Sequence, residues 1–223
     1  MTFSLIELTL RVAIVATLIN LPLALAVSWY LGRTNAPGRF LIEVIVSLPL
    51  ALPPVSIGFF LLLLLGREGV IGGVLAKLFA VDLVFTWIAA TIAAAVVSFP
   101  LMARAVLVAM AGVDNRLELA ARSLGASRWR VFATITLPLA YRGILAGMLL
   151  GFVRALSEFG ATIVVAGNIE GKTQTLPLAI YTSVMLRDDN RALILILVSI
   201  VLAAVTLAVH NWLLTRDAVD KSL

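Results

Sequence analysis

The sequence predicts an all-α protein, a polytopic bundle of transmembrane helices that also carries a short pair of helices outside the membrane. Composition is the first reason: 62% of the 223 residues are apolar and 13% are charged, whereas soluble domains average about 45–50% and about 25%. The mean hydropathy is +1.11. Five apolar stretches reach the length of about 20 residues that a membrane span needs, and one polar, basic stretch interrupts them.

The first two expected spans cover residues 8–31 and 40–65. No basic cluster precedes the first stretch, so we expect it to be retained as a span rather than cleaved as a signal peptide. The second stretch contains Pro49, Pro53 and Pro54. Because proline removes a helical hydrogen bond and clashes with the preceding turn, we expect this span to be bent or broken.

The other three expected spans cover residues 84–110, 143–166 and 192–214. Pro100 lies inside the first of these and predicts an interruption there. The last contains the single histidine, His210, with a tryptophan two positions later. Because tryptophan is typical of the membrane surface, we interpret this histidine as an interfacial residue.

The distribution of basic residues predicts the orientation, because lysine and arginine are more frequent in cytoplasmic loops. With the N-terminus outside and the C-terminus in the cytoplasm, ten basic residues face inward and six face outward. The inward set is Arg33, Arg39, Arg104, Arg116, Arg122, Arg128, Arg130, Arg142, Arg216 and Lys221. The chain has neither a short repeat nor a linker, so we expect one membrane domain over residues 1–223.

The polar segment, residues 114–138, is longer than the roughly 2–8 residues that usually connect two helices. Asp114 can cap the N-terminus of a helix, and Gly125 suits the left-handed position that ends one. Between them, four apolar residues follow helical spacing and share one face: Leu117, Ala120, Ala121 and Leu124.

A second short helix is expected after Ser127, which can cap it. Trp129, Phe132 and Ile135 then share a face, and Pro138 ends the helix before the chain re-enters the membrane. The pattern alone leaves two interpretations open. The two helices either rest on lipid headgroups or form a docking element for a partner.

The stretch ELAARSLG at 118–125, followed after nine residues by ITLP, resembles the EAA motif, the cytoplasmic signature of permease subunits of ABC importers. Glu118 departs from it by standing one place before the usual glutamate position, which Leu119 occupies. In that family the segment is a coupling helix seated in a cleft of a cytosolic ATPase. The resemblance therefore assigns ATPase coupling to Leu117, Glu118, Ala120, Ala121, Leu124, Gly125, Ala126, Arg128, Ile135, Leu137 and Pro138.

Two more stretches carry the resemblance, SLPLALPPVSIGF at 47–59 and RALSEFGATIVVAGNIEGKTQTLPLAIYTSV at 154–184. With the coupling segment, they look most like the molybdate permease subunits of this family. Sulfate and thiosulfate permeases have a run similar to the second stretch and are the alternative. The resemblance implies a path for molybdate, and for tungstate, which has nearly the same shape and charge.

Molybdate is a tetrahedral dianion, and neutral hydrogen-bond donors can pass it along without trapping it. Hydroxyls, amides and backbone N–H groups at the ends of broken helices are donors of this kind. The candidates for the path are Ser47, Ser56, Ser157, Thr162, Asn168 and Thr173. Serine and threonine inside spans also serve to pack helices together, and that interpretation stays open for each of them.

Arg154 and Glu158 lie four residues apart in the fourth span, a spacing that places two side chains next to each other on a helix. Ionisable groups are costly in a bilayer and usually face the interior of the bundle. The pair either fixes the geometry of the bundle or acts as a gate. As a gate, Glu158 repels anions in one state, and Arg154 attracts them in another.

After the fourth span, residues 176–185 are apolar enough to form a short helix near the outer surface. In the ABC importer family such a segment closes the external gate and meets a soluble binding protein. An ordinary capping helix is the alternative.

The chain has no G-x-x-x-x-G-K-[ST] phosphate-binding loop, so we expect it not to be an enzyme, and we place ATP and Mg²⁺ on a partner. Neither a cofactor nor a metal is expected, because the chain has no cysteine and one histidine. The expected partners are two copies of a cytosolic ABC ATPase, a soluble extracytoplasmic molybdate-binding protein, a second copy of this chain and the lipid bilayer of a bacterial or archaeal cell. Nucleic acid is not expected.

Three other classes of membrane protein fit less well. A secondary transporter often has carboxylates at the midplane, whereas the one deep carboxylate, Glu158, has an arginine beside it. A membrane enzyme needs a catalytic set, and neither HExxH nor GxSxG occurs. A channel conducts without an ATPase. None of the three classes explains the predicted docking segment.

Overall fold

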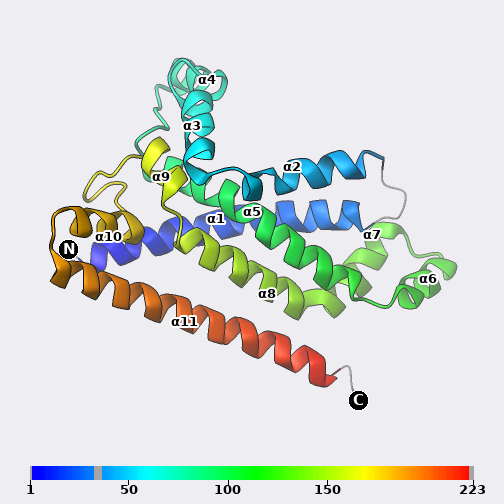
Figure 1. Cartoon of the computed structure of the whole chain (residues 1–223). Helices are drawn as coiled ribbons and strands as arrows, with labels where there is room; N and C mark the ends of the chain where they lie inside the picture. Colours follow the sequence, from blue (N-terminus) through cyan, green and yellow to red (C-terminus); the bar gives the residue numbers. More distant parts are fainter. Residues whose placement is uncertain (1, 33–36, 221–223) are drawn as a thin grey trace.

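A computed structural model describes residues 2–32 and 37–220, with the side chains of Thr2 and residues 214–220 left aside. Among the residues behind the predicted orientation, Arg33 and Lys221 lie outside the described residues, as does the side chain of Arg216. The regular structure of the described residues is helical, which confirms the predicted fold class (Figure 1). The helices are α1 Thr2–Leu31, α2 Arg39–Ala51, α3 Pro54–Leu65, α4 Val70–Phe79, α5 Trp87–Ala111, α6 Asn115–Ser123, α7 Arg128–Val131, the π-helix η1 Phe132–Thr136, α8 Leu137–Leu156, α9 Gly160–Val165, α10 Leu176–Met185 and α11 Asp189–Asp220.

Four helical runs in the described residues are long and apolar enough to cross a membrane, and a bent pair makes a fifth crossing. The runs lie in α1, in α5, in α7 to α8 and in α11, and α2 with α3 forms the bent pair. These elements correspond in order to the five predicted spans. The fourth differs most: it runs without a break from Arg128 to Leu156, and α9 completes it after three more residues.

The break in the second span lies where the prolines predict it. Helices α2 and α3 meet at an angle of 111°, and the two residues between them, Leu52 and Pro53, are extended. Each of them precedes a proline, and the residue before a proline is disfavoured in the helical region. Pro54 then occupies the first position of α3, where its missing N–H removes no helical hydrogen bond.

The expected interruption at Pro100 is wrong. Helix α5 continues through this proline, whose side chain is buried against the neighbouring helices. A membrane helix tolerates proline where adjacent helices and local adjustments satisfy the freed carbonyl groups. The tertiary surroundings, rather than the residue type, decide whether proline breaks a span.

Helices α1, α5 and α8 pack against one another at the centre of the bundle. Polar side chains on α1 reach the backbone of α5: Asn20 Nδ2 donates to the Ala95 carbonyl at 2.9 Å, and Ser28 Oγ donates to the Ala103 carbonyl at 3.0 Å. Between α5 and α8, a Cβ atom added to Gly151 would lie 2.5 Å from Cε of Met102. Close approach at small residues and interhelical hydrogen bonds are the usual means of helix association in lipid.

His210, which the sequence predicts to be interfacial, packs against a neighbouring helix. Its side chain is buried, and Nδ1 lies 3.0 Å from the carbonyl oxygen of Ala146. The histidine therefore fixes α11 against α8, which is its principal neighbour.

The two ends of the bundle carry different elements. Helices α6 and α7 lie at one end, whereas α9 and α10 lie at the other, and α3 and α4 project from the side of the bundle near α9 (Figure 1). Helix α4 was not expected from the sequence. A bidentate ion pair joins the turn before α4 to the loop after it: Arg67 Nε lies 2.7 Å from Oδ1 of Asp82, and Arg67 Nη2 lies 2.6 Å from Oδ2. Hydrogen bonding to Arg67 lowers the pKa of the Asp82 carboxyl.

Candidate functional site

The first candidate site is the docking element, residues 114–138, at the end of the bundle opposite α10. Asp114 accepts a hydrogen bond from the Arg116 N–H at 2.9 Å and caps α6. The helix ends at Gly125, whose φ is +87°. The Ala126 N–H then bonds the Ala121 carbonyl at 3.0 Å, as in a Schellman C-terminal cap. Both predicted ends of the first short helix are therefore confirmed.

The apolar face of α6 is left uncovered by the described part of the chain. Leu124 is 90% exposed and Leu117 is 48% exposed, and α6 contains no buried residue. An amphipathic helix normally buries its apolar stripe. This face is therefore available to a partner or to lipid, as the two interpretations of the sequence require.

The second short helix starts as predicted and ends elsewhere. Ser127 accepts a hydrogen bond from the Arg130 N–H at 3.3 Å and caps α7. The expectation that Pro138 ends this helix is wrong, because α7 continues through η1 into α8 as one run, Arg128–Leu156. Pro138 stands at the start of α8, just after the π turn, in which the Leu137 N–H bonds the Phe132 carbonyl.

An aromatic cluster joins the docking element to the end of α1. Trp129 and Phe132 stack with their ring centres 5.4 Å apart, and Trp29 meets the edge of Trp129, also at 5.4 Å. The predicted common face of Trp129 and Phe132 is therefore packed on α1, and Ile135 beside them is half-buried.

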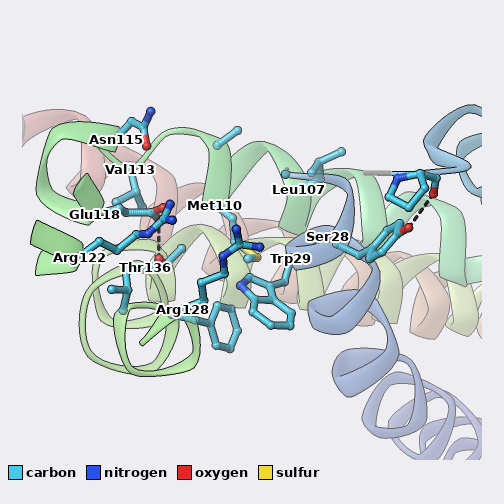
Figure 2. A pocket seen from close by; sticks show the side chains of 16 residues that line it. Ser28, Trp29, Leu107, Met110, Val113, Asn115, Glu118, Arg122, Arg128 and Thr136 are labelled. Carbon is cyan, nitrogen blue, oxygen red and sulfur yellow. Dashed lines mark hydrogen bonds between the residues drawn. The ribbon is translucent and has the colours of Figure 1, made fainter. Parts of the chain in front are cut away.

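Glu118 links the two halves of the docking element. Its Oε1 accepts a hydrogen bond from Oγ1 of Thr136 at 2.5 Å, which ties α6 to the π turn at the start of the membrane helix. A pocket of about 630 Å³ opens here. Figure 2 shows Glu118, Thr136 and Arg122 together on one side of the pocket and Arg128 beside Trp29 on the other. The partners Glu118 and Thr136 lie 18 positions apart, so no local sequence pattern could have identified them.

The second candidate site is the break between α8 and α9. Arg154 and Glu158 form an ion pair of 2.9 Å, in which the Glu158 side chain is 2% exposed. The other carboxylate oxygen accepts the Ala161 N–H at 2.8 Å. The predicted pairing is confirmed, although Glu158 lies beyond the end of α8 and bonds the first turn of α9 rather than sharing a helix face with Arg154.

The two broken spans meet at this junction. A Cβ atom on Gly58 in α3 would lie 2.6 Å from the Ala161 carbonyl oxygen in α9. A Cβ atom on Gly160 would lie 3.0 Å from Cβ of Pro54 and 3.4 Å from the Val55 nitrogen. The starts of α3 and α9 are thus in direct contact, as their neighbouring positions in Figure 1 indicate. The absence of a side chain at Gly160 permits this close contact.

The predicted path residues fall into three groups. Ser47 lies on α2, where it accepts a hydrogen bond from Arg104. The second group surrounds the junction of α3, α8 and α9: Ser56, Arg154, Ser157, Glu158 and Thr162. Ser157 is exposed, whereas Thr162 is buried. Asn168 and Thr173 form the third group, in the loop before α10.

The third group is engaged in hydrogen bonds within the outer loop. Asn168 Nδ2 donates to Oγ1 of Thr182 at 2.8 Å, and Thr173 Oγ1 accepts the Ile169 N–H at 3.0 Å. The side-chain oxygens of Gln174 and Thr175 are buried without a partner in the described residues. The predicted short helix at 176–185 is confirmed as α10. The Leu176 N–H bonds Oγ1 of Thr9, a link to α1 that the sequence did not reveal.

No group of three His, Asp or Glu side chains that could hold a metal ion occurs in the described ranges. The arrangement offers instead an uncovered helix at one end, a paired helix break near the other, and one continuous helix between them. In this arrangement a displacement of the uncovered helix can be passed along the continuous helix to the paired break.

Comparison with known proteins gives a consistent result. Residues 9–216 match the family described as the binding-protein-dependent transport system inner membrane component. The molybdenum transport system permease protein ModB of Haemophilus influenzae is 46% identical over 217 residues, which cover 97% of this chain and 95% of the relative. ModB of Escherichia coli K12 is 47% identical, over 92% and 90%. The sulfate transport system permease protein CysT of the same strain is 36% identical, over 89% and 70%.

Solved structures share the fold at lower sequence identity. The MetNI methionine ABC transporter in an inward-facing conformation has a TM-score of 0.75 at 17% identity, over 95% of this chain and 93% of that one. A bacterial transporter that imports the polysaccharide alginate has a TM-score of 0.69 at 17% identity, over 97% and 78%.

Proposed function

The chain belongs to the family of binding-protein-dependent transport system inner membrane components, and from this premise we propose that it is the permease subunit of an ATP-driven importer of molybdate, with tungstate as a second substrate. The observation that carries the proposal is the similarity to the two molybdenum transport permeases, which extends over nearly the full length of both proteins. The sulfate transport permease is less similar and matches a smaller share of its own length. Sulfate is therefore the alternative substrate.

The energy enters through a separate ATPase subunit, which docks on α6. Three features support this part of the proposal. The apolar face of α6 is uncovered, the helix is capped at both ends, and Glu118 connects it to the run that crosses the membrane. A docked ATPase that moves α6 would therefore also move α8.

Two copies of the chain enclose the path. Helix α2 has no buried residue, and α3 exposes large apolar side chains such as Phe59, Phe60 and Leu63. A closed two-fold dimer uses the same surface of both copies, and the side of the bundle that carries α2 and α3 supplies such a surface. One copy of each helix is too few to surround an anion.

The end that carries α6 faces the cytoplasm, and the end that carries α10 faces outward. A soluble molybdate-binding protein delivers the anion to the α10 end, where the outer loop is held by its own hydrogen bonds. The basic residues of the docking element support this orientation, because positive loops stay in the cytoplasm.

The test is transport by the complete complex. The chain, its ATPase and the binding protein are reconstituted in vesicles, and the uptake of labelled molybdate is measured with and without ATP. We expect uptake that needs ATP and the binding protein, and that excess tungstate suppresses more strongly than sulfate. Equal suppression by sulfate would favour the alternative substrate, and uptake driven by an ion gradient without the ATPase would exclude an ABC importer.

A further inference from the structure

Arg104 is a cation inside a membrane-crossing helix. It lies seven positions before the last residue of α5, Ala111, which is about 10 Å along the helix axis at 1.5 Å per residue. Its side chain is exposed on the surface of the chain. Nη2 donates to Oγ of Ser47 on α2 at 2.9 Å.

Ser47 fixes the depth of the guanidinium group. The serine lies eight positions after the first residue of α2, Arg39, or about 12 Å along its axis. An arginine near the end of a helix can extend toward the membrane surface, but the bond to Ser47 holds Arg104 at the level of the serine. Charged groups at such depth face the interior of an assembly or a water-filled cavity.

No carboxylate neutralises Arg104 in the part of the chain that the structure describes. Arg154, another arginine within a membrane-crossing run, is paired with Glu158. The nearest acidic residue to Ser47 along α2 is Glu43, one turn away, and its carboxylate is engaged with Arg39 at 2.7 Å. The charge of Arg104 therefore remains available to an anion from outside the chain.

We infer that Arg104 and Ser47 form an oxyanion-binding station on the transport path, in the half of the membrane nearest the docking element. The inference rests on the proposed function. A guanidinium group presents several N–H donors to the oxygens of a tetrahedral anion. Ser47 accepts one hydrogen bond from Arg104 and keeps its own proton to donate. One cation at an open surface attracts a dianion without enclosing it.

The same chemistry fits the phosphate of a lipid headgroup, and a thiol probe separates the two sources. The chain has no cysteine, so Ser47→Cys places a single thiol in it. The complete complex is reconstituted in vesicles of zwitterionic lipid alone and, separately, in vesicles that contain anionic lipid. An anionic and a neutral methanethiosulfonate reagent are compared, and the modification of this chain is read by its mass. Ile45→Cys, at an exposed position on the other side of α2, is the control.

We expect the anionic reagent to modify the thiol at position 47 roughly tenfold faster than the neutral one, because the positive charge concentrates anions there. Molybdate slows this modification in both kinds of vesicle, and Arg104→Gln abolishes the preference and the protection. At position 45 neither effect appears. An unreactive thiol at position 47, equal rates, or protection by anionic lipid but not by molybdate would each overturn the inference.

Transport distinguishes this inference from the proposed function. Arg104→Gln should lower the molybdate imported per ATP hydrolysed several-fold and leave the apparent affinity for the loaded binding protein unchanged, whereas Arg104→Lys restores part of the import. If the wild-type complex transports molybdate and Arg104→Gln leaves import unchanged, the oxyanion-binding role of Arg104 and Ser47 is rejected. The proposed function is then retained. Absence of molybdate uptake by the wild-type complex removes the function itself.

Discussion

The Glu158 carboxylate has a partner for each oxygen, the Arg154 guanidinium and the Ala161 N–H. Buried charges persist in proteins when they are paired and hydrogen-bonded in this way. The Ala161 N–H near the start of α9 is occupied by the protein's own carboxylate and is not free to bind a passing anion. The contacts therefore favour the structural interpretation of the pair, and a gate would require Glu158 to leave both partners.

Glu158→Gln tests this choice. Glutamine has one acceptor oxygen, and if that oxygen stays on the Ala161 N–H, its N–H₂ group faces Arg154, so the arginine loses its counter-charge. We expect a loss of stability of about 2 kcal/mol, below the roughly 3–5 kcal/mol of a fully buried pair, because Arg154 is 28% exposed. Thermal unfolding of the complex in detergent measures it. The exposed pair of Glu170 with Arg191, at 3.6 Å, supplies the control Glu170→Gln, which should change little.

The same variant decides between the interpretations through transport. If the pair is structural, the variant imports as much anion per folded, assembled complex as the wild type, even though fewer complexes stay folded. Loss of import from a folded, assembled Glu158→Gln complex would contradict that expectation and support the gate.

Thr136 offers a test of the link between the docking element and the membrane helix. Thr136→Val replaces the hydroxyl that donates to Glu118 by a methyl group of similar size, whereas Thr136→Ser keeps the donor. A hydrogen bond to a charged group contributes about 1.5–3 kcal/mol. We therefore expect the valine variant to hydrolyse ATP but import less anion per ATP, and the serine variant to behave as the wild type. Ser123→Ala, which removes a bond within α6, is the control, and equal coupling in all three variants would contradict the link.

The elements themselves show where sequence patterns succeed. The caps of the docking element, Asp114, Gly125 and Ser127, are local, so each could be predicted from a few neighbouring residues. The break at Pro53 could be predicted for the same reason. Pro100 and Pro138 could not, because the surroundings of one and the π turn before the other keep the helix continuous.

Contacts between elements could not be predicted from local sequence patterns. The spacing of Arg154 and Glu158 could be read from the chain because they are four residues apart. The bonds of Glu118 to Thr136 and of Ser47 to Arg104 join residues 18 and 57 positions apart, and only the packing of the helices brings them together. The contact of α3 with α9 is of the same kind.

That contact gives a third prediction. Gly58→Ala adds a methyl group that would lie 2.6 Å from the Ala161 carbonyl oxygen, so the backbone of α3 or α9 must move. We expect a loss of about 1–3 kcal/mol, as for overpacking in a core, seen as a lower unfolding temperature of the assembled complex. Leu63→Ala, at an exposed position of the same helix, should cost less; an equal loss in both variants would mean that the approach of the helices is not close.

One helical run connects the two candidate sites. From Arg128 to Leu156 the chain forms a run of 29 residues, about 43 Å long at 1.5 Å per residue. Its first turns contact α6 through Thr136, and its last turn holds Arg154. A helix of this length has few ways to absorb a displacement except at its π turn and at its end. A displacement of α6 by a bound partner is therefore transmitted to the junction of α3 and α9.

The last prediction concerns the binding of the ATPase to α6. Two leucines on opposite faces of the helix allow a matched pair of variants. Leu124, on the apolar face, is 90% exposed, and Leu119, five positions earlier and about 140° around the helix axis, is 51% exposed. Neither is part of the core, so Leu124→Asp and Leu119→Asp should leave the stability of the chain itself nearly unchanged. If the apolar face docks into the ATPase, a charge at position 124 costs about 2 kcal/mol or more, as at an interface hot spot. The ATPase should then fail to co-purify with Leu124→Asp, and ATP-driven import should stop, whereas Leu119→Asp retains both. Co-purification and import that survive the change at position 124 would show that the uncovered face serves the membrane surface instead.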